Sequence, residues 1–327
     1  MILMSKTRPA RVRWHTPASS KHESLRIMCA TDLCSRSDQA IRRALDLGDM
    51  LDAEVMLLHV VSGNLPLRLA GRRAARARDA LAWYVRRHSR VRSAPEISVR
   101  IGSYRRTIVR AAKEWGADIV VLGTQRRRRA DRLLWSTVER VAHLVRKPVL
   151  AVTTDSGRRY GGVTFLSRRH LGLSVRVADE LDLFDSAHVT VVPYRALHYR
   201  ALHWLGERLR SRNESLASKL RAALHRRDRK TLELAGLHLM GFEIAGGLST
   251  RALLARIKQA RGSQLLVAGT DLLSTTLRGF PTKAIVWALR HRACDVLIVP
   301  ASHARASFGD VSFAAARAAR ERSMIVS

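Results

Sequence analysis

Short apolar runs alternate with segments of helical periodicity through the first half of the chain. The runs carry hydrophobic residues on both faces, which is typical of strands buried in a parallel sheet. Such strands are expected at residues 25–32, 54–61, 96–102, 118–124 and 148–153. Between them, apolar residues repeat every three or four positions over 40–51, 108–115 and 134–145, which predicts amphipathic helices. This alternation indicates βαβ units and an open α/β sheet.

The same order starts again after a turn-rich break at residues 154–162. Strands are expected at 162–167, 188–194, 237–245, 264–270 and 295–300. The residues repeat as well, because IVVLGT at 119–124 parallels LLVAGT at 265–270, an offset of 146. A period of this length indicates a duplicated domain rather than a solenoid. The predicted organisation is a basic disordered arm (1–24), a first domain (25–154), a linker (155–161), a second domain (162–300) and a C-terminal helix or tail (301–327).

The charge of the chain is strongly positive. There are 59 lysines and arginines against 27 acidic residues, a formal net charge of +32, and only eight of the 59 are lysines. Codon composition is one explanation of this arginine bias. An anionic partner is the other: a nucleotide, a nucleic acid, polyphosphate or a membrane surface. The three cysteines form no disulfide framework, and no apolar run reaches the 18 or so residues of a membrane span, so a cytoplasmic location is expected.

Candidate chemistry lies where strands end, because open parallel sheets bind ligands beyond the carboxyl ends of their strands. Asp32 ends the first strand and can accept hydrogen bonds from a ribose or an adenine amino group. The alternative for residues 32–38 is helix capping, which suits Ser35 or Ser37. Gly123 ends the fourth strand and allows close approach of a ligand. Ser136 and Thr137, at a helix start, offer hydroxyls and free N–H groups to phosphate.

Several segments together resemble the universal stress protein family. They are ATDLCSRS at 30–37, LLHVV at 57–61, ADIVVLGT at 117–124, and VERV at 138–141 followed by KPVL at 147–150. The resemblance covers residues 25–154, and the second half resembles a diverged copy. It implies two tandem, Rossmann-like, open parallel sheets of five strands with flanking helices. It also implies that the last strands, 148–153 and 295–300, pair to form an internal pseudo-dimer, with a homodimer as a further option.

The resemblance also suggests a nucleotide site. The glycine-rich pattern of ATP-binding members falls on Gly123, Arg126, Ser136 and Thr137, while Asp32 and Val60 match positions that face the adenosine. Arginine replaces glycine at position 126, where it either crowds the phosphates or holds them with its guanidinium group.

The second half departs further from this pattern. Its corresponding residues are Gly269, Leu272, Thr282 and Lys283, with Phe165 at the position of the carboxylate. We therefore expect that this half does not bind ATP in the family's usual way.

The function predicted is that of a non-catalytic stress-response regulator whose first domain binds ATP or a related nucleotide. The alternative is a scaffold or polyanion-binding pseudo-dimer that uses Arg126–Arg129, the basic arm and residues 195–230. A third hypothesis is an ATP hydrolase, although the sequence lacks the common nucleophile, phosphate-loop and zinc motifs. No metal is expected, and the protein partner is unknown.

Overall fold

The computed structural model describes residues 24–34, 37–88, 94–123, 137–153, 159–167, 181–193, 242–244, 264–272 and 294–300, with seven isolated residues between 173 and 289. The expected arm before residue 24, the segment 195–230 and the expected tail at 301–327 lie outside these residues, and so do Arg126–Arg129 and Ser136.

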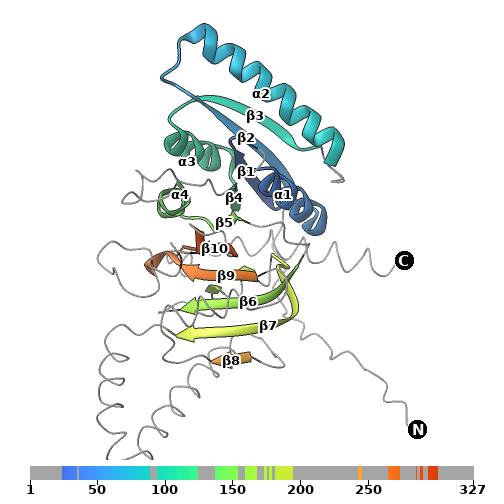
Figure 1. The fold of residues 1–327 in the computed structure, drawn as a ribbon, viewed down its shortest axis with the longest axis vertical. Helices are drawn as coiled ribbons and strands as arrows, with labels where there is room; N and C mark the ends of the chain where they lie inside the picture. Colours follow the sequence, from blue (N-terminus) through green and yellow to red (C-terminus); the bar gives the residue numbers. More distant parts are fainter. Residues whose placement is uncertain are drawn as a thin grey trace, which may run out of the picture.

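The first half contains five parallel strands in the order β3-β2-β1-β4-β5 (Figure 1). Their bounds are Arg26–Thr31 (β1), Glu54–Ser62 (β2), Glu96–Gly102 (β3), Ile119–Gly123 (β4) and Val149–Val152 (β5). Each strand lies within a residue of its predicted limits. The three predicted helices are present as α1 (Asp38–Leu51), α3 (Tyr104–Trp115) and α4 (Thr137–Val145). A fourth helix, α2 (Leu67–His88), was not predicted.

The second half has the same strand order read in the opposite direction along the sheet, as β10-β9-β6-β7-β8. The strands are Tyr160–Ser167 (β6), Phe184–Pro193 (β7), Phe242–Ile244 (β8), Gln264–Gly269 (β9) and Asp295–Val299 (β10). A short 3-10 helix, η2 (Thr270–Leu272), follows β9. β6 begins two residues earlier than predicted because Tyr160 pairs with Phe184 of β7. Residues 160 and 161 therefore belong to the sheet rather than to a linker.

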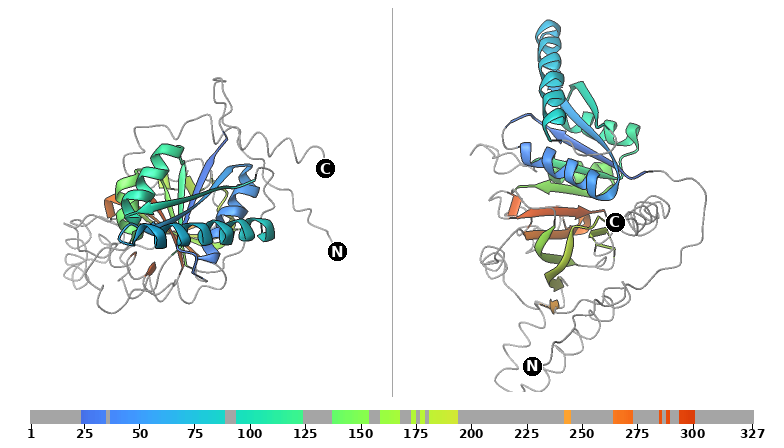
Figure 2. Two further views of the ribbon diagram at one scale, coloured as in Figure 1. Left: turned by 90° about the horizontal axis from the view of Figure 1, so that it is seen from above. Right: turned by 90° about the vertical axis from the view of Figure 1, so that its right-hand side faces the viewer.

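The two halves join through their last strands. β5 pairs antiparallel with β10, with Leu150 opposite Leu297, so that one ten-stranded sheet runs through the described part of the chain. This pairing confirms the prediction for the last strands. Figure 2 shows the halves stacked along one axis, with the joint between them.

Two apolar layers cover the sheet, because successive side chains of a strand point to opposite faces. One layer lies under α1 and includes Ile27 and Leu57; the other lies under α3 and α4 and includes Met28 and Leu58. Both layers continue across the joint between the halves.

One strand differs from its prediction. β3 was expected to be buried on both faces, but it is the edge strand of the first half, and the Ile101 side chain is 49% exposed.

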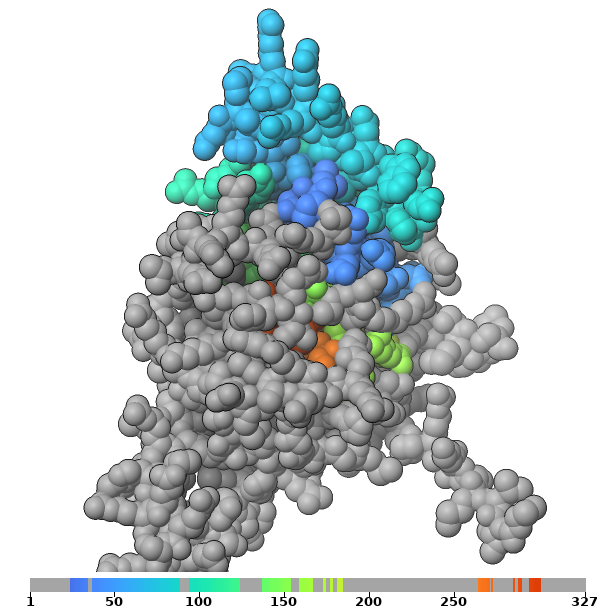
Figure 3. Space-filling model, in the orientation of Figure 1, coloured from blue at the N-terminus to red at the C-terminus, as the bar shows by residue number. Residues whose placement is uncertain are grey.

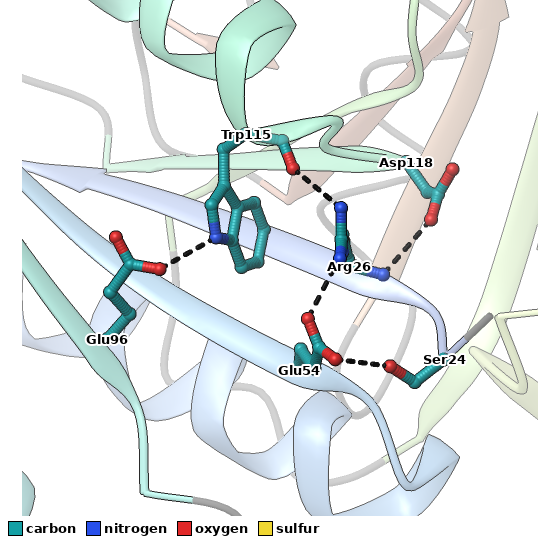
Figure 4. A network of polar contacts seen from close by, with 6 residues as sticks. All are labelled: Ser24, Arg26, Glu54, Glu96, Trp115 and Asp118. Carbon is teal, nitrogen blue, oxygen red and sulfur yellow. Dashed lines mark hydrogen bonds and ion pairs between the residues drawn. The ribbon is translucent and has the colours of Figure 1, made fainter.

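A polar network ties together the amino ends of the first strands (Figure 4). Arg26 donates from its side chain to Glu54 and to the Trp115 carbonyl, and from its backbone N–H to Asp118. The indole of Trp115 donates to Glu96 at 2.8 Å. This network lies at the edge of the sheet opposite the carboxyl ends, so we assign it to the stability of the fold.

Candidate functional site

The first half has a topological switch point between β1 and β4. The chain runs outward from β1 through β2 to β3, then returns to place β4 on the other side of β1. Asp32 follows β1 and Gly123 ends β4, and the strands pair with Ala30 opposite Leu122. The structure therefore brings these two predicted residues to the same edge, where α/β sheets of this kind bind ligands.

Two helices begin at this edge, on opposite faces of the sheet. α1 packs in one apolar layer and α4 in the other. Each follows a strand and leads back toward the start of its parallel neighbour, so its amino end lies near the carboxyl ends of the strands. Helix amino ends carry partial positive charge and free N–H groups, which favour anions.

The Asp32 carboxylate organises the loop between β1 and α1. Its Oδ1 accepts hydrogen bonds from the Cys34 backbone N–H at 3.1 Å and from the Ser37 hydroxyl. Ser37 occupies the N-cap position of α1, but its side chain makes no capping hydrogen bond to the helix. The capping interpretation was therefore wrong for the Ser37 side chain, whose hydroxyl faces Asp32 instead.

The loop also contains a strained residue. Leu33 has φ of 59°, in the left-handed region that bulky residues rarely adopt. Its N–H donates to the Thr31 hydroxyl at 3.0 Å, and this local bond helps to hold the conformation. Nothing in the sequence signalled this strain, because leucine is not a residue typical of positive φ.

Gly123 is required for packing within the protein. A Cβ atom at this position would lie 3.0 Å from the Ser37 Oγ and 3.2 Å from its Cα. The sequence suggested that this glycine admits a ligand, whereas in the structure the close neighbour is the start of α1. Gly123 thus lets Ser37 reach Asp32.

Val60 and His59 lie on β2, next to β1. The Val60 side chain is buried in the layer under α3 and α4, so any ligand contact at this position would go through its backbone. The His59 ring nitrogen Nδ1 lies 3.0 Å from the Thr31 carbonyl oxygen. His59 therefore supports the end of β1.

Of the predicted phosphate-binding residues, the structure describes Gly123 and Thr137. Thr137 is exposed and is the first residue of α4. Arg126 and Ser136 lie outside the described residues, so their roles remain predictions.

The cysteines differ in their surroundings. Burial raises the pKa of the Cys29 thiol to about 12, and that of Cys294 also to about 12. Cys34, in the loop after β1, is partly exposed and lies 3.7 Å from the Ser37 Oγ. Cys34 is therefore the accessible thiol at the candidate site.

The second half has its own switch point, between β6 and β9. Leu166 pairs with Ala268 there, as Ala30 pairs with Leu122 in the first half. This register makes Phe165 the counterpart of Cys29 in the first half, not the counterpart of Asp32. The assignment of Phe165 to the carboxylate position was therefore wrong, and that position falls on residue 168, outside the described residues.

One expected counterpart of the phosphate loop at this switch point packs in the core. Leu272, expected in the place of a phosphate-loop residue, is 1% exposed and packs in the layer under α3 and α4.

Within the described residues, no cluster of three or more histidine, cysteine or acidic side chains has the arrangement of a metal site. No helix in the same part of the chain has both the length and the apolar composition of a membrane span.

The fold places the chain among open, doubly wound α/β proteins, which bind ligands at the switch point of the sheet. Residues 24–153 match the model of the universal stress protein family. This part of the chain is therefore similar to universal stress protein domains. No curated protein sequence matches the chain significantly.

Solved structures extend the likeness of fold to most of the chain. A universal stress protein from Archaeoglobus fulgidus DSM 4304 is 13% identical, with a TM-score of 0.55 over 84% of this chain and 96% of its own. A protein of unknown function from Pseudomonas aeruginosa PAO1 is 13% identical, with a TM-score of 0.57 over 92% of this chain and 98% of its own. A putative universal stress protein from Pseudomonas aeruginosa UCBPP-PA14 is 14% identical, with a TM-score of 0.54 over 85% and 92%. At these identities the likeness concerns the fold alone.

Proposed function

We propose that the first half binds ATP or a related nucleotide at the β1–β4 switch point, and that the bound nucleotide regulates an interaction of the protein. The observation that carries this proposal is the meeting of Asp32 and Gly123 at one edge, between the amino ends of α1 and α4.

The nucleoside end of the ligand would lie beside Asp32. The hydrogen bonds from Cys34 and Ser37 hold the carboxylate at the edge of the sheet. A ribose hydroxyl or an adenine amino group can donate to a carboxylate held in this way. Val60, one strand away, would contribute its backbone.

The phosphates would lie toward α4. The amino end of this helix, with the exposed Thr137 hydroxyl, suits an anion. By sequence, Arg126 and Ser136 lie between Gly123 and α4, and a guanidinium group there would add a bidentate phosphate contact.

The proposed mechanism is regulatory rather than catalytic. A ligand shifts a conformational equilibrium only as far as it binds one state better than the other. The loop that carries the strained Leu33 is the element that a nucleotide would reach first. We infer that nucleotide binding selects one arrangement of this loop and of the start of α1.

The test is calorimetric titration of the full chain with ATP at moderate salt. Asp32→Ala should weaken binding at least tenfold, because it removes both the acceptor and the anchor of the loop. Glu114→Gln is the matched control, since it removes an exposed carboxylate from the carboxyl end of α3 and should leave the affinity unchanged. Absence of ATP binding at millimolar concentration, or equal affinity of both variants, would refute the proposal.

A further inference from the structure

Helix α2 is the longest helix of the described residues, and one face of it is largely uncovered. Its 22 residues span about 33 Å at 1.5 Å per residue. Its buried residues are Ala70, Ala77 and Leu81, which anchor it on the outer strands of the first half. Figures 2 and 3 show α2 at the end of the molecule farthest from the second half, with its side chains reaching outward.

The exposed surface of α2 is rich in arginine. The helix carries seven arginines and no lysine, and all seven are exposed: Arg68, Arg72, Arg73, Arg76, Arg78, Arg86 and Arg87. At about 100° per residue, Arg68, Arg72, Arg76, Arg86 and Arg87 fall within an arc of about 100°. This arc faces away from the three buried residues, so the arginines form one row along the solvent side of the helix.

The charge is concentrated on this helix rather than spread evenly over the surface. α2 has seven arginines and one aspartate, a net charge of 7 − 1 = +6. α1 has two arginines and three aspartates, a net charge of 2 − 3 = −1. Codon composition acts on both helices alike and does not explain this difference.

The α2 arginines also differ from others in the way they are paired. Elsewhere in the described residues, Arg26, Arg100 and Arg159 each form an ion pair with a carboxylate. None of the seven α2 arginines has a carboxylate within 4 Å among the residues that the structure describes. Arg87 contacts an aromatic ring instead: its guanidinium group lies 5.6 Å from the centre of the Trp83 ring, and Trp83 is 51% exposed.

We propose that the arginine face of α2 binds the phosphate backbone of double-stranded nucleic acid. Arginine suits phosphate because its planar guanidinium group makes two parallel hydrogen bonds. The row from Arg68 to Arg87 is about 28 Å long, enough to reach phosphates on both sides of a major groove about 12 Å wide.

Two other anionic partners fit less well. A membrane-surface helix needs a free apolar face. The buried face of α2 packs on the sheet, and its exposed apolar residues do not share one face, because Leu67 lies on the opposite side of the helix from Leu69 and Trp83. A single strand needs a platform of several aromatic side chains on which bases stack, and of the tryptophan and tyrosine of α2 only Trp83 is exposed. The contact expected is therefore electrostatic and independent of sequence.

The test measures binding of the full chain to a fluorescently labelled 20-base-pair DNA duplex of arbitrary sequence, by anisotropy between 50 and 300 mM salt. The test variant replaces Arg68, Arg72 and Arg76 with glutamine, which keeps helix propensity. The matched control replaces Arg106, Arg110 and Lys113 with glutamine. These three exposed cations lie on α3, on the other face of the sheet.

The α2 variant should lose at least tenfold in affinity at 100 mM salt. Its plot of log K against log salt should flatten by about 3, because each lost phosphate contact removes about 0.9 from the slope. The α3 control should keep nearly the affinity and slope of the unaltered protein. Equal losses in both variants would indicate general charge attraction and overturn the proposal. An unchanged α2 variant, or tighter binding of a single strand than of the duplex, would also overturn it. Circular dichroism establishes that both variants are folded.

This test is independent of the proposed nucleotide site. The α2 variant leaves Asp32 and Gly123 intact, so ATP titration of the same variant separates failure of the one proposal from failure of the other.

Discussion

Asp295 lies wholly buried where the two halves meet, and its carboxylate accepts hydrogen bonds from Thr153 and Tyr160. The Thr153 backbone N–H donates to it at 2.7 Å and the Thr153 hydroxyl at 3.1 Å. The Tyr160 hydroxyl donates to its other oxygen at 2.6 Å. These donors come from the end of β5 and the start of β6, so one β10 side chain ties both halves together. We predict that this cluster stabilises the joint.

The magnitude follows from the bonds and their burial. A hydrogen bond to a charged group contributes about 1.5–3 kcal/mol, so Tyr160→Phe should lower the free energy of unfolding by that amount. Asp295→Ala removes the acceptor of these three bonds from a buried position. The desolvation cost of the carboxylate disappears at the same time. We therefore expect a net loss of about 3–5 kcal/mol, less than the sum of three separate bonds.

The assay is equilibrium unfolding of the full chain in urea, followed by circular dichroism. Tyr104→Phe is the matched control, because Tyr104 is 49% exposed and its variant should lie within about 0.5 kcal/mol of the unaltered protein. If Asp295→Ala changed the free energy of unfolding no more than this control, the reasoning would be refuted. A joint held by apolar packing of β5 against β10 alone would give that result.

Three further predictions concern the first half. Gly123→Ala should destabilise the fold by about 1–3 kcal/mol, because the added Cβ overpacks the start of α1. Gly71→Ala is the control: this glycine has open space around it, so alanine should stabilise α2 by up to about 1 kcal/mol. Thermal unfolding of the two variants compares their stabilities. Iodoacetamide at pH 8 should label Cys34 and spare Cys29, because burial raises the pKa of the Cys29 thiol to about 12. ATP should slow the labelling of Cys34 if the proposed site is correct. Peptide mass spectrometry measures both effects. Hydrogen bonds from Arg110 and Arg100 lower the pKa of Glu114 below its ordinary value of 4.5. Its contribution to stability is therefore present above pH 4.5 and is lost as the pH falls below that value. In acid unfolding, the stability of Glu114→Gln should decline less over this range than that of the unaltered protein.

Most of the sheet could be predicted because buried parallel strands carry a strong signal. The runs at β1, β2, β4 and β5 are apolar on both faces, and the structure buries both faces. β3 was misjudged because it was grouped with these runs, although its sequence, EISVRIG, alternates polar and apolar residues. That alternation is typical of a strand with one exposed face. α2 was missed because its buried side is narrow: three small or aliphatic residues among seven arginines give little of the usual helical periodicity.

The strand-end positions of Asp32 and Gly123 could be predicted from the sequence, but their contacts could not. Asp32 and Gly123 could be found because strand ends at a switch point are where ligands bind. The role of Ser37 could not be found, because a serine before a helix is normally read as a cap. Its hydroxyl bonds to Asp32 only because Gly123 leaves room for it, and these residues lie on separate segments.

The misplacement of Phe165 shows how strand pairing corrects a sequence repeat. β4 and β9 are 146 residues apart, as Leu122 and Ala268 show, whereas their partners Ala30 and Leu166 are 136 apart. The second half therefore has ten more residues between its first and fourth strands than the first half has. A run such as VTFLS at 163–167 is apolar enough to fit several registers, so the sequence alone does not fix its alignment with β1. Pairing with β9 fixes it, since a slip of one residue would turn every side chain of β6 to the opposite face.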